Sequence, residues 1–135
     1  MISGQVQAHH ALLNAAVRLP GQPDVTLEFA VDTGFIASLT LPPAAVAAMN
    51  LPFLRRITAN LADDSIIRLG VYSATLVWNG QDRNVEVLAT GRRPLMGTLL
   101  LDGHELNVQF ADGGLVIETA GGVPSKMVNF PGAYR

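Results

Sequence analysis

One short segment constrains this chain more than any other: an apolar strand pattern that runs directly into Asp32-Thr33-Gly34. The residues before it alternate between apolar and other side chains, which is typical of a half-buried strand; the apolar ones are Val25, Leu27, Phe29 and Val31. Asp32 falls on the opposite face, and Gly34 permits a tight turn. The segment therefore predicts a carboxylate held at the end of a strand, although the same residues also occur in ordinary surface turns.

Length and composition indicate one ordered domain. We expect a single domain over 1–135, with its core at 5–119 and an irregular tail at 120–135. Apolar residues make up 49% and charged residues 15% of the chain, so disorder is excluded and apolar surface is available for burial between subunits. The net charge of −2 gives no electrostatic reason to expect a nucleic-acid partner.

Targeting signals and thiol chemistry are not indicated. The first residues lack the basic and apolar segments of a signal peptide, and no apolar run has the length of a membrane span. The chain contains no cysteine, which excludes a disulfide framework. We therefore expect a cytoplasmic protein with no membrane partner.

The remaining pattern predicts short strands separated by tight turns, with Asn79-Gly80 as the strongest hairpin signal. An alanine-rich segment led by prolines predicts a short helix at 42–50. These features favour an all-β barrel or sandwich with one or two short helices. The expected strands are a bent strand at 5–19, then 25–31, 36–41, 54–61, 65–78, one through 85–89, 105–110 and 114–119, with a helical turn at 98–101.

The segment from Val31 to Pro42, together with Leu95-Met96-Gly97 downstream, resembles the retropepsin-like aspartic proteases. The likeness is strongest to the small bacterial and archaeal single-domain members and covers residues 5–119. It implies an all-β, small closed barrel of the retropepsin (acid-protease) type. It also implies an aspartic endopeptidase that acts on a peptide or protein substrate, with Asp32 as the catalytic residue.

Acid–base hydrolysis of a peptide bond by carboxylates needs two of them close enough to share a proton. The chain offers one suitable Asp, because the other candidates lack the glycine, the hydroxyl residue or the preceding strand; these are Asp64-Ser65-Ile66, Asp102-Gly103 and Asp112-Gly113. The resemblance implies a homodimer in which the partner supplies the second Asp32. Thr33 would then donate its hydroxyl across the two-fold axis, and Gly34 would permit close approach of the chains.

The hairpin at 54–78 would cover the site, with a tip of Ala62, Asp63, Asp64 and Ser65. Retroviral members carry glycine in this tip and alanine in place of Phe35. These two departures favour an alternative in which the dimer binds peptides without cleaving them. A β-barrel with a coincidental Asp-Thr-Gly stays open as a further alternative, whereas an actin-like ATPase needs two large lobes.

Other catalytic chemistries fail on spacing. His9 and His10 are adjacent, so on a strand they point to opposite faces and cannot chelate one metal together. His104-Glu105 lacks the second histidine of a zinc peptidase motif. No serine lies in a nucleophile-elbow motif. We therefore expect no metal and no cofactor.

Overall fold

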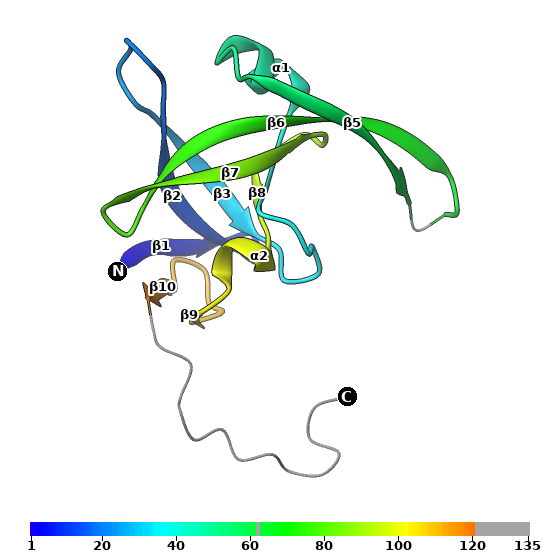
Figure 1. Ribbon diagram of the computed structural model, residues 1–135. Coiled ribbons are helices and arrows are strands. Elements are labelled where there is room, and N and C mark those ends of the chain that lie inside the picture. Colours follow the sequence, from blue (N-terminus) through cyan, green and yellow to red (C-terminus); the bar gives the residue numbers. More distant parts are fainter. Residues whose placement is uncertain (62, 121–135) are drawn as a thin grey trace.

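The strands of this chain hydrogen-bond into one continuous sheet that closes on itself (Figure 1). The computed structural model describes residues 1–61 and 63–120. The sheet order is β5-β6-β7-β4-β8-β3-β2-β1-β10-β9, and an additional pairing of β6 with β2 joins the middle strands into a ring. The elements are β1 (Ile2–Gln7), β2 (His10–Arg18), β3 (Val25–Val31), β4 (Leu39–Leu41), α1 (Pro43–Ala48), β5 (Phe53–Asn60), β6 (Ile66–Trp78), β7 (Gln81–Ala89), β8 (Leu95–Met96), α2 (Thr98–Leu101), β9 (His104–Val108) and β10 (Leu115–Ala120).

The all-β class, the closed barrel and the two short helices predicted from the sequence are confirmed. Asn79 and Gly80 have φ angles of 51° and 77° and connect β6 to β7 as the hairpin signal predicted. The predicted tail falls outside the described residues from position 121 onward, while Ala120 still belongs to β10. No described helix has the length and apolar character needed to cross a membrane.

The prediction of one bent strand over 5–19 is wrong. Ala8 and His9 have φ angles of 47° and 67°, and they form a tight turn between two antiparallel strands, β1 and β2. The change of apolar face that suggested a bend is therefore a reversal of the chain. Alanine is rare at positive φ, so Ala8 carried no turn signal in the sequence.

The predicted strand at 36–41 is shorter than expected, because only Leu39–Leu41 forms β4. The residues before it belong to a loop whose carbonyl groups face the β8–α2 connection. Ala37 O accepts the N–H of Leu99 at 3.3 Å, and Ser38 O accepts the N–H of Gly97 at 2.9 Å. These hydrogen bonds connect the loop to residues far away in the sequence.

The core fills the inside of the ring with aliphatic side chains and a few aromatic ones. Phe29, Leu39 and Met96 are fully buried there, each contributing about 1.5–3 kcal/mol by leaving water. Along β6 the buried positions change parity: Ala74, Leu76 and Trp78 are buried near the end of the strand, whereas Leu69 and Val71 are buried earlier. One end of β6 therefore packs into the barrel, and the other end belongs to the projecting hairpin.

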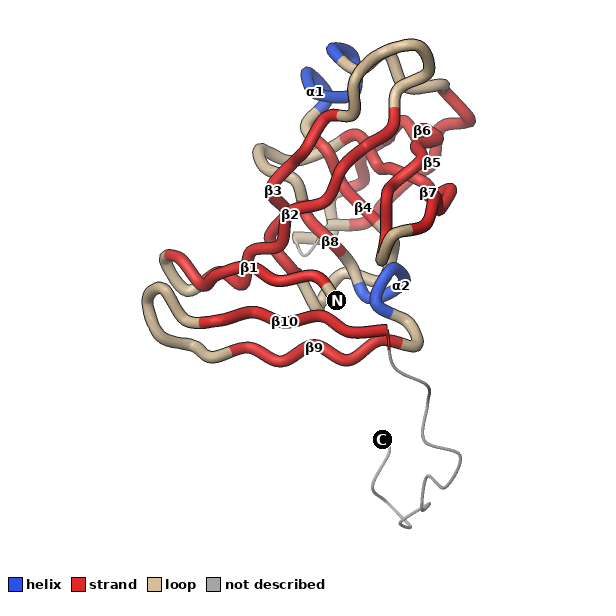
Figure 2. The backbone as a smooth tube through the Cα atoms, turned by 90° about the vertical axis from the view of Figure 1, so that its left-hand side faces the viewer, coloured by secondary structure: helices blue, strands red, loops and turns tan. Residues whose placement is uncertain are grey.

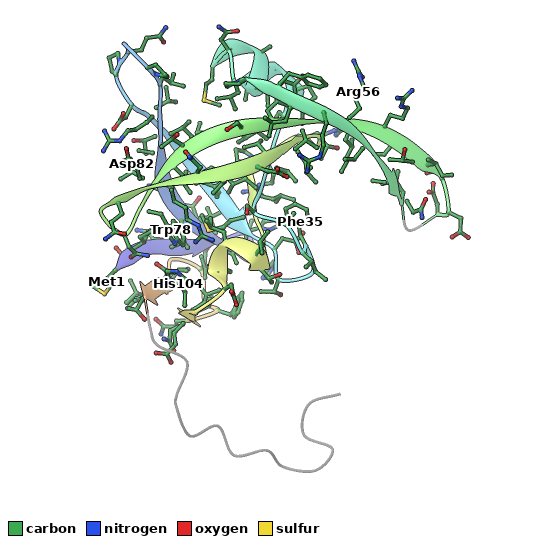
Figure 3. The ribbon with its side chains drawn as sticks, in the orientation of Figure 1. Met1, Phe35, Arg56, Trp78, Asp82 and His104 are labelled. Carbon is green, nitrogen blue, oxygen red and sulfur yellow. The ribbon has the colours of Figure 1, made fainter. Side chains whose placement is uncertain are left out.

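Figure 2 shows β1, β10 and β9 lying side by side at the bottom of the molecule. A fully buried carboxylate, Glu118, lies in this layer and contacts Nδ1 of His104. Nδ2 of Asn79 donates to the same carboxylate at 3.3 Å, and the indole N–H of Trp78 donates to Nε2 of His104 at 3.4 Å (Figure 3). An indole N–H can only donate, so Nε2 of His104 is the acceptor in this contact.

The shortest strand of the sheet, β8, joins two longer segments of the ring. It passes between β3 and β4, parallel to the first and antiparallel to the second. Gly97, which follows it, has no room for a side chain: a Cβ there would lie 2.2 Å from Ala37 O and 2.7 Å from Phe35 O. Glycine at this position is therefore required by close packing of backbone on backbone.

We expect Gly97→Ala to lower the free energy of unfolding by about 3 kcal/mol, because the added methyl group must displace two carbonyl groups. Gly21→Ala is the matched control. Gly21 has a φ of +69° but open space around its Cβ position, so its replacement costs only about 1 kcal/mol of backbone strain. Denaturant unfolding of both variants measures the difference, and equal losses would contradict the close-packing argument.

Candidate active site

Asp32 follows directly after β3 and is partly exposed. Its backbone N–H donates to Met96 O at 2.9 Å, which places the residue at the top of the β3–β8 pair. Its side-chain Oδ1 accepts the N–H of Gly34 at 2.9 Å, and its carbonyl accepts the N–H of Phe35 at 3.2 Å. The predicted geometry is confirmed: a carboxylate at a strand end, oriented by a tight turn.

The turn continues into a loop that is fixed along its length. Phe35 O accepts two hydrogen bonds from Thr98, one from the backbone N–H at 2.9 Å and one from the hydroxyl at 3.2 Å. Together with the bonds to Ala37 and Ser38, these contacts attach the loop at 33–38 to the start of α2. A loop held in this way keeps Asp32 in one orientation without help from a ligand.

Phe35 is the bulky residue that stands where retroviral members carry alanine, and its ring lies against Gly97. Its Cδ2 atom is 2.6 Å from the position that a Cβ on Gly97 would occupy. The side chain is partly buried, and Figure 3 shows it at the loop beside α2. The ring therefore fills the space that the missing side chain leaves, and it braces the loop.

The sheet face that carries Asp32 can be followed from strand to strand. Paired residues form one row across five strands, and in order they are Ala30, Leu95, Thr40, Leu88 and Val71. Asp32 lies two residues beyond Ala30 and so shares its face. In the following row on the same face, two residues further along, the register places Gly97, Ser38 and Glu86 in line with Asp32. A mainly apolar floor therefore adjoins the carboxylate.

An ion pair marks the far end of this face. Arg55 donates two hydrogen bonds to the carboxylate of Glu86, at 2.6 and 2.9 Å. The hydrogen bonds from Arg55 hold the pKa of Glu86 below its ordinary value. The pair connects β5 to β7 across β6, and no sequence pattern pointed to it.

The β5–β6 hairpin projects from the barrel and curves toward the side on which the loop at 33–38 lies (Figure 1). Ile57 pairs with Leu69 and Ala59 with Ile67, so these apolar side chains share one face. Arg56 belongs to the other face and points away from the barrel (Figure 3). Between Ile57 and the tip, the hairpin therefore turns an apolar surface toward the barrel, and Arg55 lies on the same face at the base of the hairpin.

The hairpin tip lies where the sequence predicted a turn. Asp63 Oδ1 accepts the N–H and the hydroxyl of Ser65 at 3.0 and 2.5 Å, and these bonds lower the pKa of Asp63. Asp64 takes a φ of 65° and donates its N–H to Leu61 O at 3.0 Å. Ala62, the remaining predicted tip residue, lies outside the described residues. Side-chain hydrogen bonds thus shape a turn that contains no glycine.

The structure brings Leu95-Met96-Gly97 next to Asp32-Thr33-Gly34, as strand β8 and its exit. It leaves the tip residues on a separate, projecting element. Thr98 was missed by sequence reasoning, although a hydroxyl residue directly after the second motif was a usable signal. Within residues 1–61 and 63–120, no three His, Asp or Glu side chains lie close enough to hold a metal ion.

The fold of this chain is similar to that of a known protein. No family model matches the chain, and no curated protein matches its sequence. The structure is similar to the crystal structure of a retropepsin-like aspartic protease from Rickettsia conorii, with a TM-score of 0.55 and 17% sequence identity. The match covers 87% of this chain and 88% of that one. With Asp32 at the end of β3 and β8 inserted beside it, the chain has a retropepsin-like aspartic protease fold.

Proposed function

We propose that this protein is a homodimeric aspartic endopeptidase in which Asp32 of each chain forms one half of the catalytic pair. One observation carries the proposal: on a retropepsin-like fold, Asp32 stands at a strand end with Oδ1 held by the Gly34 N–H at 2.9 Å. The similar protein from Rickettsia conorii is named an aspartic protease, which supports the same reaction class.

The chemistry needs one ionised and one protonated carboxyl group. The ionised Asp32 takes a proton from water while the water oxygen bonds to the peptide carbonyl carbon, and the protonated Asp32 gives its proton to the carbonyl oxygen. The tetrahedral intermediate then collapses and the C–N bond breaks: the leaving nitrogen takes the proton that the first Asp32 removed from water, and a hydroxyl of the intermediate returns a proton to the other Asp32. Two carboxyl groups about 3 Å apart hold one shared proton, because both cannot ionise at that distance.

A second chain is required because this face offers no other suitable carboxylate. Glu86 shares a row with Asp32 but lies three strands away, about 14 Å at the usual strand spacing. Its oxygens are also engaged by Arg55. A two-fold axis beside Asp32 supplies a symmetry-equivalent Asp32 with the same loop geometry.

The neighbouring residues fit this arrangement. Thr33 and Gly34 are exposed at the turn, where the hydroxyl can donate to the partner's backbone and the glycine allows the two loops to approach. The face of the β5–β6 hairpin that carries Ile57 and Ala59 would cover an extended peptide and offer it backbone hydrogen bonds. The Phe35 ring packs against Gly97 and braces the loop that follows Asp32.

We expect Asp32→Asn to lower kcat for an unstructured protein substrate by at least about 10³-fold, because an amide accepts the Gly34 hydrogen bond but cannot transfer the proton. Asp102→Asn, at an exposed position after α2, should retain the parent rate. Circular dichroism and sedimentation would show that both variants keep the fold and the assembly. Parent-like cleavage by Asp32→Asn would refute the proposal. Absence of cleavage by the parent across a broad peptide library would favour the binding protein.

The pH dependence of kcat/KM should be bell-shaped, with both limbs on the acid side of neutrality. The shared hydrogen bond makes the first ionisation of the Asp32 pair easier, and the charge then present opposes the second. Rates with a quenched fluorescent peptide across pH 3–8 would measure this, with thermal melts at each pH as the folding control. A rate that rises steadily to pH 8 would contradict a shared-proton pair.

The β5–β6 hairpin should open as a lid. Its tip is a polar turn on a projecting two-stranded arm, whereas the end of β6 is buried in the barrel. We expect amides at 61 and 63–65 to exchange with deuterium faster than those at 74–78, and to slow when a non-cleavable peptide binds. Hydrogen exchange with mass spectrometry measures both effects, and a tip among the best protected segments would exclude the lid role.

A further inference from the structure

The loop beside Asp32 presents an isoleucine to solvent in a fixed position. Ile36 is 86% exposed, more than any other large apolar side chain in the described part of the chain. Its neighbours on both sides are anchored, since Phe35 O and Ala37 O accept bonds from Thr98 and Leu99. The loop at 33–38 carries no charged residue. Covering this side chain in an assembled state would remove apolar surface from water, which is favourable.

A matching hollow lies on the other flank of Asp32. It has a volume of about 470 Å³, and we call it the Phe110 groove; its lining residues are Val6, Ala8, His9, Phe110, Ala111 and Asp112. Phe110 is 71% exposed. The groove has firm walls, because Val6 exchanges backbone hydrogen bonds with Gly113 and Gly114 at 2.9 and 2.8 Å.

One wall of the groove is the strained turn between β1 and β2. Ala8 and His9 both adopt positive φ, at 47° and 67°. Such conformations cost about 1 kcal/mol or more for residues other than glycine, and a two-residue hairpin turn requires them at both positions. The turn lies close to the site, because β2 pairs with β3 through Leu12 and Ala30, and the same register carries His10 to the side of Asp32.

A two-fold axis at the site relates these two features. The loop with Ile36 leaves Asp32 on one flank, and the Ala8–His9 turn lies on the flank nearer β2. Rotation by 180° about an axis beside Asp32 exchanges the flanks, so the loop of one chain comes to face the turn of the other. A rotation that pairs the two carboxylates therefore brings an exposed apolar side chain toward an apolar hollow.

We propose that Ile36 of each chain inserts into the Phe110 groove of a second copy and thereby fixes the separation of the two Asp32 carboxylates. The inference rests on the proposed function for its two-fold axis, and it adds the contact that holds the dimer together. Val6, Ala8 and Phe110 supply apolar surface for the isoleucine, while Asp112 places a negative charge at the groove. The contact occurs twice in the dimer, once in each direction.

Because Asp112 is negatively charged, a negative and a positive side chain at position 36 should affect the dimer differently. Sedimentation equilibrium of the full chain would give the dimer dissociation constant for the parent, Ile36→Asp and Ile36→Lys. We expect Ile36→Asp to weaken the dimer by at least about 100-fold, since it loses apolar burial and faces Asp112. Ile36→Lys should weaken it about 10-fold, because lysine can pair with that carboxylate. Asp112→Ala combined with Ile36→Asp should recover at least threefold of the loss.

Leu54→Asp is the matched control, an exposed apolar residue at the start of β5 that should leave the dimer constant unchanged. Thermal melts would confirm that each variant folds. Two results would overturn the inference if the parent is a dimer. One is an equal dimer dissociation constant for Ile36→Asp and the parent. The other is an equal loss for Ile36→Asp and Ile36→Lys with no recovery from Asp112→Ala. An unchanged constant with a raised KM would assign Ile36 to the substrate and overturn it as well. A parent that is monomeric at all concentrations would overturn the proposed function and this contact together.

Discussion

The hydrogen bond from Asp32 N–H to Met96 O is the interaction on which the site depends. It exists because β8 is inserted between β3 and β4, two strands that follow one another in the sequence but do not pair. The loop at 33–38 that joins those strands must then pass over the end of β8, and it is there that Gly97 and Thr98 bind its carbonyl groups. The carboxylate is therefore positioned by a crossing of distant segments, and the turn itself supplies only the final hydrogen bond from Gly34.

This crossing explains why residues beside the carboxylate can differ from those of retroviral members without loss of the geometry. A bulky Phe35 is accommodated because Gly97 leaves an empty volume against which the ring packs. The glycine-free tip is a similar case. Side-chain hydrogen bonds between Asp63 and Ser65 stabilise the turn there, whereas glycine would permit it through the freedom of its backbone. In both places packing or hydrogen bonding replaces a residue type.

The features that sequence reasoning could predict are those set by local chemistry. The strand ending at Asp32, the Asn79-Gly80 turn and the proline-led helix each depend on neighbouring residues, and all three are confirmed. The features that it missed depend on distant contacts. The Ala8–His9 turn uses residues with no turn preference, and it is stabilised by the pairing of β1 with both β2 and β10. Glu118 and His104 carried no motif, because their contact arises only when β9 and β10 fold beneath the β6–β7 turn. The shortened strand before Leu39 likewise reflects carbonyl groups taken by residues about sixty positions away.

The proposed assembly of the site from two half-sites would have a consequence for control. Each chain would carry one carboxylate in a prepared geometry, so folding alone would leave it without the acid–base pair and association would complete it. The fraction of chains in complete sites would then follow the dimer equilibrium, and well below the dissociation constant the concentration of complete sites would rise with the square of the chain concentration. Interactions at the flanks of Asp32 consequently act on catalysis through the assembly, even where they touch neither water nor substrate. An exposed isoleucine on a rigid, uncharged loop is suited to that role, because its burial contributes to association and to nothing in the separate chain.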